Sequence, residues 1–289
     1  MKIGLQVPRF TNTKGPAGIG SGLIDVAQAA EAAGFYSLWV MDHFFQIGSA
    51  GPPEMDMLEA YTTLGFCAAA TKRIKLGALA TGVVYRHPGI LVKTVTTLDV
   101  LSGGRAYFAV GAAWYEREAK GLGAPFPPLG TRFEMLEETI QIAKQMWSGT
   151  VAPYHGKHFH LEETLCRPLP LTRPHPPIMV AGAGEKKTLF LAAKYGDACN
   201  VYGAGDAVAH KFEVLKRHCE TLGRDYGSIE KTAINGMPSG PLPVKDIIAQ
   251  CRALADIGAD QAMFSFPGLD EIAALTVFGK EIIPAVAEF

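Results

Sequence analysis

The sequence has little of what a nucleic-acid-binding, membrane or secreted protein needs. Its 27 Lys and Arg residues are balanced by 28 Asp and Glu, and no basic block stands out, whereas nucleic-acid-binding proteins usually carry an excess of basic residues that neutralise the phosphates. No run approaches the ~18 apolar residues of a membrane span. The first residues, MKIGLQVPRF, hold no apolar stretch of a secretory signal. We therefore expect a cytoplasmic protein that binds neither nucleic acid nor a membrane.

Paired cysteines and low-complexity stretches are also missing. The five cysteines are odd in number and form no CxxC pair, which favours a reduced protein over a disulfide scaffold or a zinc site. Gly and Pro together make up 51 of 289 residues, below the ~25–30% that marks low-complexity chains. With 48% hydrophobic residues, the chain has ample material for a large core.

What the sequence does contain is eight short apolar runs, each followed by a helical pattern. Strands are expected at 3–7, 37–41, 75–80, 105–110, 178–181, 198–201, 232–235 and 261–265, and helices near 22–33, 58–70, 87–101, 131–147, 186–195, 206–222, 244–257 and 269–288. Strict alternation predicts a parallel sheet with crossover helices. A doubly wound sheet typically uses five or six strands, whereas eight units can close into a barrel. We expect one α/β domain over 1–289, a (β/α)8 TIM barrel.

Two connections are longer than a simple turn. Residues 8–21 are rich in Gly and polar groups and are expected to form a mobile lid. Residues 148–177 are Pro-rich and predict an insertion before strand five, a small hairpin followed by an extended segment. His155, His158 and His160 lie in it, but their spacing matches no strong ligand pattern, so no metal site is expected.

Barrel chemistry sits at the C-terminal ends of the strands, which directs attention to the residues that follow each expected strand. Asp42 and His43 follow strand two, where an imidazole can donate or accept a proton near neutral pH; alternatively they are a turn cap and a core histidine. Small residues end strands three to five. They leave room for a flat ligand or for close backbone approach to an anion, or they form ordinary tight turns. Trp114 could be a wall of such a site or pack under a loop.

Taken together, these segments resemble the bacterial luciferase-like superfamily of flavin and deazaflavin barrel oxidoreductases. The Asp42–His43 pair at the end of strand two is similar to the coenzyme F420-dependent branch. The residues that carry the resemblance are Leu38–Phe44, Thr81–Val83, Arg86–Pro88, Thr97–Arg105, Gly111–Trp114 with Glu116 and Glu118, and Ala181–Gly184.

The resemblance implies roles for individual residues. His43 would lie beside the deazaflavin ring and act in catalysis by orienting or polarising the substrate, with Asp42 fixing its surroundings. A non-prolyl cis peptide would fall around Leu79–Ala80 behind the ring. Gly182, Ala183 and Gly184 would hold the cofactor phosphate through backbone amides. The remaining cofactor contacts would come from Asp42, Leu79, Ala80, Thr81, Gly111, Ala112 and Ala113, and substrate contacts from Phe44 and Trp114.

Trp114 is a departure from one part of the family. It stands where F420-dependent sugar-phosphate dehydrogenases place a proton-donating Glu, so sugar-phosphate oxidation is not expected and a more apolar substrate pocket is favoured.

The function implied is an F420-dependent oxidoreductase that transfers a hydride between deazaflavin C5 and a small organic substrate. The alternatives are an FMN-dependent monooxygenase served by a partner reductase and a cofactor-binding barrel without turnover. Because relatives dimerise through barrel helices, a homodimer is expected.

Overall fold

Strands and helices alternate along the computed structural model, which describes residues 1–203, 205–236, 243–266 and 268–289. The strands are β1 (Lys2–Val7), β2 (Ser37–Val40), β3 (Lys75–Ala78), β4 (Thr81–Gly82), β5 (Phe108–Gly111), β6 (Tyr154–His155), β7 (His160–Leu161), β8 (Ile178–Ala181), β9 (Ala198–Tyr202), β10 (Glu230–Gly236) and β11 (Gln261–Ser265). The helices are α1 (Ile19–Ala33), α2 (Ala60–Ala70), α3 (Pro88–Ser102), α4 (Glu116–Gly121), α5 (Leu129–Trp147), α6 (Thr188–Tyr195), α7 (Asp206–Leu222), α8 (Val244–Asp256), α9 (Ile272–Val277) and α10 (Ile283–Val286).

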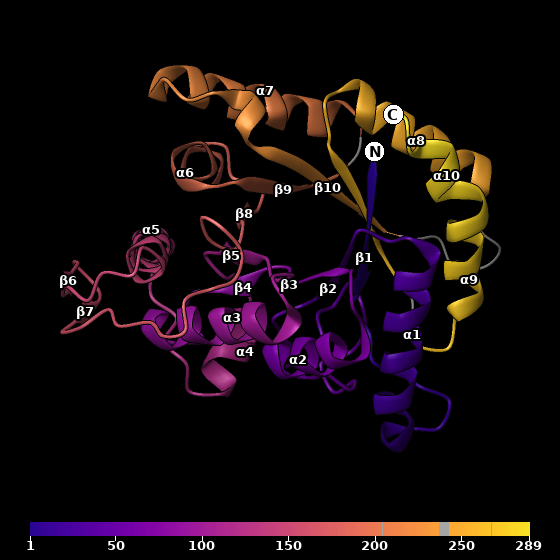
Figure 1. The fold of residues 1–289 in the computed structure, drawn as a ribbon, viewed down its shortest axis with the longest axis horizontal. Coiled ribbons are helices and arrows are strands. Elements are labelled where there is room, and N and C mark those ends of the chain that lie inside the picture. The colour runs from indigo at the N-terminus through magenta and orange to yellow at the C-terminus, as the bar shows by residue number, and fades with distance from the viewer. Residues whose placement is uncertain (204, 237–242, 267) are drawn as a thin grey trace.

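The main sheet is parallel and closes on itself. Its strands follow the order β3-β2-β1-β11-β10-β9-β8-β5-β4. A parallel bridge between Leu76 of β3 and Ala106, just before β5, joins the two ends of this order. The helices lie outside the strands (Figure 1). The predicted (β/α)8 barrel is confirmed, with β3 and β4 as two pieces of one interrupted third strand. The expected cis peptide, Leu79–Ala80, lies at that interruption.

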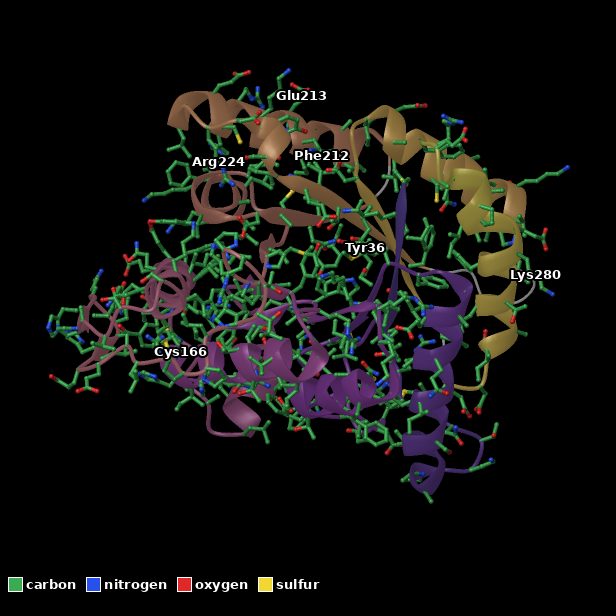
Figure 2. The ribbon with its side chains drawn as sticks, viewed as in Figure 1. Tyr36, Cys166, Phe212, Glu213, Arg224 and Lys280 are labelled. Atoms are coloured by element: carbon green, nitrogen blue, oxygen red, sulfur yellow. The ribbon has the colours of Figure 1, made fainter. Side chains whose placement is uncertain are left out.

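Two apolar cores result from this closure. One fills the barrel interior, where Trp39 is fully buried among side chains such as Tyr107, Met179 and Met263. The other lies between the strands and the surrounding helices. Figure 2 shows this division on α7, where Phe212 faces inward and Glu213 faces outward. Phe212 is only 2% exposed, as the amphipathic spacing of the helix requires.

Several boundaries differ from those predicted. Strand four begins at Phe108 and not at Arg105, because the backbone just before Phe108 makes only a single bridge to Leu76 of β3. The Arg105 side chain is buried there, and its guanidinium donates to the carbonyls of Ala68, Thr71 and Ile74. The expected helix 269–288 is divided into α9, a π-helical turn and α10, which has a proline in its first turn. Helix α4 was not predicted, because six residues are too few to show helical periodicity.

The insertion before β8 contains the predicted hairpin, in which β6 and β7 pair antiparallel. The hairpin lies outside the barrel, beyond α5 (Figure 1). Within the expected lid, the structure has a 3₁₀ turn at Pro16–Gly18 and starts α1 at Ile19; its mobility stays a prediction. Among the described residues, no helix is both long and apolar enough to cross a membrane.

Candidate functional site

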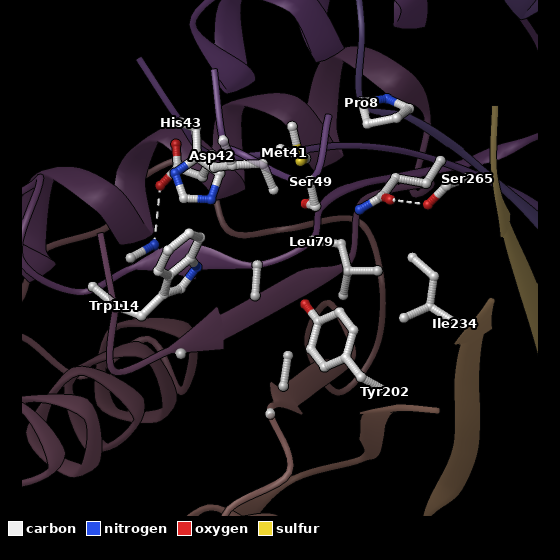
Figure 3. Close-up of a pocket in the computed structure, with 18 of the residues that line it drawn as sticks. Pro8, Met41, Asp42, His43, Ser49, Leu79, Trp114, Tyr202, Ile234 and Ser265 are labelled. Carbon is white, nitrogen blue, oxygen red and sulfur yellow. Dashed lines mark hydrogen bonds between the residues drawn. The ribbon is translucent and has the colours of Figure 1, made fainter. Parts of the chain in front are cut away.

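A cavity of about 680 Å³ opens at the C-terminal ends of the barrel strands (Figure 3). Figure 3 shows His43 beside Trp114 on one side, Tyr202 and Ile234 on the other, and Leu79 between them. The predicted residues that line it are Asp42, His43, Leu79, Ala80, Gly111, Ala112, Ala113, Trp114 and Gly182. The predicted residues Phe44, Thr81, Ala183 and Gly184 are not part of its lining.

One wall of the cavity is built from small residues at the ends of β5 and β8. A Cβ atom on Gly111 would lie 3.3 Å from the Ala181 carbonyl oxygen, so any side chain there would crowd the neighbouring strand. Gly182 has a φ of +130°, which L side chains rarely adopt. Ala113 holds a positive φ of 59°, and its carbonyl accepts a hydrogen bond from Arg132 at 2.5 Å. The backbone at Gly111 and Gly182 thus excludes larger side chains from this wall of the cavity.

Asp42 is 2% exposed and is held by a network behind the cavity. Its carboxylate accepts two hydrogen bonds from Arg86, at 2.8 and 2.9 Å, and one from the Gly82 amide at 3.0 Å. Arg86 also pairs with Glu59 at the N-terminus of α2. Burial alone would lower the pKa of Arg86, but its bonds to Asp42 and Glu59 outweigh burial and raise it. Asp42 therefore anchors the end of β2.

His43 is held by Glu118, a fully buried carboxylate on α4. The Nδ1 atom of His43 lies 3.1 Å from Glu118 Oε1, and Tyr85 donates its hydroxyl to the same oxygen. Glu118 Oε2 accepts from the amides of Phe44 and Phe45, the second at 2.8 Å. Burial alone would raise the pKa of Glu118, but the bonds from His43, Phe45 and Tyr85 outweigh burial and lower it. Glu118 is therefore ionised at neutral pH.

The two predicted substrate contacts are placed differently. Trp114 is 62% exposed at the rim, stacked on Tyr115 with ring centroids 5.1 Å apart, and its ring meets His43 edge-on at 5.5 Å. The Phe44 ring instead packs edge-on against Tyr85, outside the cavity lining. Residue order along the chain could not show this, because the side-chain direction depends on the turn after β2. Thr81 is also turned away, and its hydroxyl bonds to Tyr61 at 2.7 Å.

Two backbone amides in the loop between β8 and α6 are available to bind an anion. The Gly182 amide already donates to the Asn200 carbonyl of β9, at 3.0 Å. The amides of Ala183 and Gly184 have no hydrogen-bond acceptor among the described residues. Glu185 does not oppose an anion here, because its carboxylate pairs with Lys211 and His210 of α7.

Sequence reasoning missed the remaining polar wall, and it named Arg86 and Glu118 without predicting that they pair with Asp42 and His43. Gln6 and Ser265, whose side chains are bonded at 2.6 Å, line the cavity from β1 and β11. Arg9, Tyr202 and Asn235 also line it. Each lies at or just after the end of an expected strand, so a survey of all eight strand ends would have found them. Among the described residues, no group of three or more His, Cys, Asp or Glu side chains is arranged to hold a metal ion.

A closed parallel barrel with its large cavity at the strand C-termini belongs to the structural class of TIM-barrel enzymes. Within that class, the family described as luciferase-like monooxygenase matches residues 1–267. The chain therefore belongs to the luciferase-like monooxygenase family, which contains oxidoreductases and monooxygenases. This confirms the family that the motifs resembled.

Relatives of known and unknown activity match most of the chain. An uncharacterized protein of Mycobacterium tuberculosis (strain H37Rv) is 27% identical, covering 83% of this chain and 86% of the relative. An F420-dependent glucose-6-phosphate dehydrogenase of Kineococcus radiotolerans is 29% identical, covering 73% and 61%. The pyrimidine monooxygenase RutA of Allorhizobium ampelinum is 26% identical, covering 78% and 65%.

Solved structures share the whole fold at low identity. An F420-dependent secondary alcohol dehydrogenase, in complex with an F420–acetone adduct, superposes with a TM-score of 0.81 at 20% identity, covering 99% of this chain and 98% of the other. A riboflavin lyase with modified FMN has the same TM-score at 13% identity, covering 100% and 91%. At these identities the likeness establishes the barrel architecture alone.

Proposed function

We propose that this protein is a coenzyme F420-dependent oxidoreductase that moves a hydride between the deazaflavin and a small organic substrate. The observation that carries the proposal is the position of His43, which lines the cavity next to a wall of small residues. The relative named as an F420-dependent dehydrogenase, at 29% identity, supports the choice of cofactor.

The cavity suits a flat cofactor of this kind. Its volume lies within the ~300–1,000 Å³ of small-molecule sites. Leu79, Ala80 and the small residues at Gly111–Ala113 would hold the ring. Ala183 and Gly184 do not line the cavity themselves but directly follow Gly182, which does, and their amides would take the phosphate at its edge. When bound, a deazaflavin supplies two-electron hydride chemistry, while the protein binds, orients and excludes water.

His43 would handle the proton that accompanies hydride transfer. Its Nδ1 is bonded to Glu118, so Nε2 is the ring nitrogen left for a substrate. In the oxidation direction, Nε2 accepts the proton that a substrate hydroxyl loses, and in the reduction direction the same atom returns it. Asp42 would act by anchoring the strand end, since all its described bonds go to Arg86 and Gly82.

The first test is a side-by-side titration of the purified protein with F420 and FMN, each oxidised and reduced. Micromolar F420 binding with weak FMN binding is expected. Turnover would then be screened with alcohols, enones and imines. The substitution His43→Ala should lower kcat by about 10²- to 10⁴-fold, the usual contribution of acid–base catalysis, with little change in cofactor affinity. An unchanged kcat would remove His43 from the mechanism.

An FMN-dependent monooxygenase is the second candidate. The observation that favours it is the similarity to RutA, which covers 78% of this chain. A monooxygenase of this kind would consume oxygen when supplied with reduced FMN and substrate, whereas an F420-dependent dehydrogenase would not. Preferential binding of reduced FMN with substrate-dependent oxygen uptake would replace the F420 proposal.

We also propose that the protein forms a homodimer through helix α3. Along α3, Ile90, Thr94, Thr97 and Leu101 recur at helical spacing, and Ile90 and Leu101 are 67% and 75% exposed. An exposed stripe of this kind would be covered by contact between two copies. Sedimentation equilibrium tests it, and a monomer at micromolar concentration would contradict it.

A further inference from the structure

Within the described part of the chain, every hydrogen-bond partner of the Glu118 carboxylate is a donor or can act as one. Two are backbone amides, those of Phe44 and Phe45, which reach Oε2. The other two, the Tyr85 hydroxyl and the Nδ1 atom of His43, reach Oε1. The side chain is fully buried, so no water competes for these positions.

This arrangement determines where His43 carries its proton. An ionised carboxylate accepts hydrogen bonds and donates none, so the imidazole atom that contacts it must carry hydrogen. The lowered pKa of Glu118 keeps the carboxylate ionised at neutral pH. In the neutral imidazole the proton therefore sits on Nδ1, and Nε2 has a free lone pair.

We propose that Glu118 is a positioning residue that holds His43 in its Nδ1–H tautomer, so that Nε2 meets the substrate as a proton acceptor. The rings of Trp114 and Tyr115 lie edge-on to His43 at 5.5 and 5.8 Å and fix the orientation of the imidazole plane. Glu118 determines which ring nitrogen carries the proton. The effect on turnover rests on the proposed oxidoreductase function, but the effect on the tautomer does not.

The substitution Glu118→Gln tests the proposal because the two carboxylate oxygens have different partners: Oε2 faces two backbone amides, and Oε1 faces the Tyr85 hydroxyl and the His43 ring. The amides of Phe44 and Phe45 cannot become acceptors, so the glutamine oxygen must face them. Its NH2 group then takes the place of Oε1 and donates toward His43 and Tyr85. The Tyr85 hydroxyl can rotate to accept, and His43 can accept only by moving its proton to Nε2. The substitution should therefore reverse the tautomer with little change in shape.

The direct measurement is ¹⁵N NMR of histidine-labelled protein at a pH where His43 is neutral. Substitution of His43 identifies its signals among the eight histidines. The wild type should show hydrogen on Nδ1, and Glu118→Gln should show it on Nε2. An Nε2–H signal in the wild type overturns the proposal, so the test holds even if the variant fails to fold.

Two control variants separate positioning from general damage. Glu138 is also buried, at 8% exposure, and accepts hydrogen bonds from the amides of Lys157, His158 and Phe159. It lies far from His43 in sequence, so Glu138→Gln should leave the tautomer and turnover unchanged. Tyr85→Phe removes a donor to Oε1 but keeps the carboxylate, and it should retain the Nδ1–H tautomer.

Kinetics then test the role in catalysis. Glu118→Gln should lower kcat by about 10²- to 10⁴-fold, as loss of a correctly protonated base does, with KM and the cofactor Kd nearly unchanged. A reversed tautomer with unchanged kcat would overturn the catalytic role. If the wild type neither binds F420 nor turns over, the proposed function fails instead, and the tautomer assignment is still decided by NMR.

Discussion

At the scale of single residues, the stability of the barrel rim depends on hydrogen-bond and ion-pair partners for its buried carboxylates. Asp42 and Arg86 are joined by two hydrogen bonds although 44 positions separate them, and Glu118 reaches back 75 positions to His43. A buried charge without a partner costs several kcal/mol, so each of these carboxylates depends on its donors. The adjacent residues Asp42 and His43 thus belong to two different networks.

The Asp42–Arg86 pair should be important for stability. Arg86→Gln removes the positive charge paired with the buried Asp42 carboxylate and at least one of its two guanidinium hydrogen bonds, and we expect a loss of about 3–5 kcal/mol in the free energy of unfolding. Arg117 pairs with Glu54 on the surface at 3.8 Å, so Arg117→Gln should cost less than about 1 kcal/mol. Urea unfolding of both variants measures the difference, and equal losses would contradict the argument.

Acid should destabilise the protein partly through Glu118. The pKa of its folded-state carboxyl lies below the ordinary ~4.3, so its stabilising effect is present above that value and is lost as the pH falls through the folded-state pKa. Glu59, whose pKa is also lowered after its bonds to Thr62 and Arg86 outweigh burial, contributes in the same direction. Urea unfolding between pH 6 and pH 3 should show a shallower decline for Glu118→Gln. A decline as steep as in the wild type would exclude Glu118 as a contributor.

At the scale of elements, β3 must pass close to the tryptophan that fills the barrel. Trp39 is fully buried, and its indole N–H donates to Ser37 Oγ at 2.7 Å. A Cβ atom on Gly77 would lie 2.3 Å from the Trp39 ring. Glycine at this position is required by the side chain of the neighbouring strand, with which Gly77 is in register.

Gly77→Ala should therefore overpack the barrel and lower the free energy of unfolding by about 1–3 kcal/mol. The matched change Gly65→Ala lies on the exposed face of α2, where nothing is within 4 Å of the new methyl group. It should stabilise the helix by about 0.5–1 kcal/mol, because alanine restricts the unfolded chain. Denaturant unfolding compares the two, and the same sign for both variants would be inconsistent with the packing described.

At the scale of the whole molecule, the five cysteines are all buried and unpaired. Burial raises the pKa of the Cys67 and Cys199 thiols to about 12 and that of Cys251 to about 11, so little reactive thiolate forms at neutral pH. Thiol reactivity thus reports opening of the fold.

We expect no rapid reaction of the native protein with Ellman's reagent at pH 8 and reaction of all five thiols in denaturant. Labelling rates below the denaturation midpoint would measure how often the barrel opens. Fast labelling of a thiol under native conditions, located by mass spectrometry, would show local opening around that cysteine.

Local pattern by itself determined the strand–helix alternation, the barrel, the hairpin in the insertion and the small residues at the strand ends. Each strand–helix unit depends on residues close in sequence, whose spacing repeats with the geometry of a helix or a strand, and the number of such units indicated the barrel. The limits of helices and strands were less predictable where pairing with a distant strand sets them, as before Phe108, where the chain makes only a single bridge to Leu76 of β3.

Only the tertiary structure decided which groups meet. The partners of Asp42 and His43, the outward turn of Phe44 and the polar wall formed by Gln6 and Ser265 all depend on how the barrel closes. Barrel closure brings the first and last strands side by side, although more than 250 residues separate them. Sequence spacing carries no record of such contacts, because they arise from packing among residues far apart in the chain.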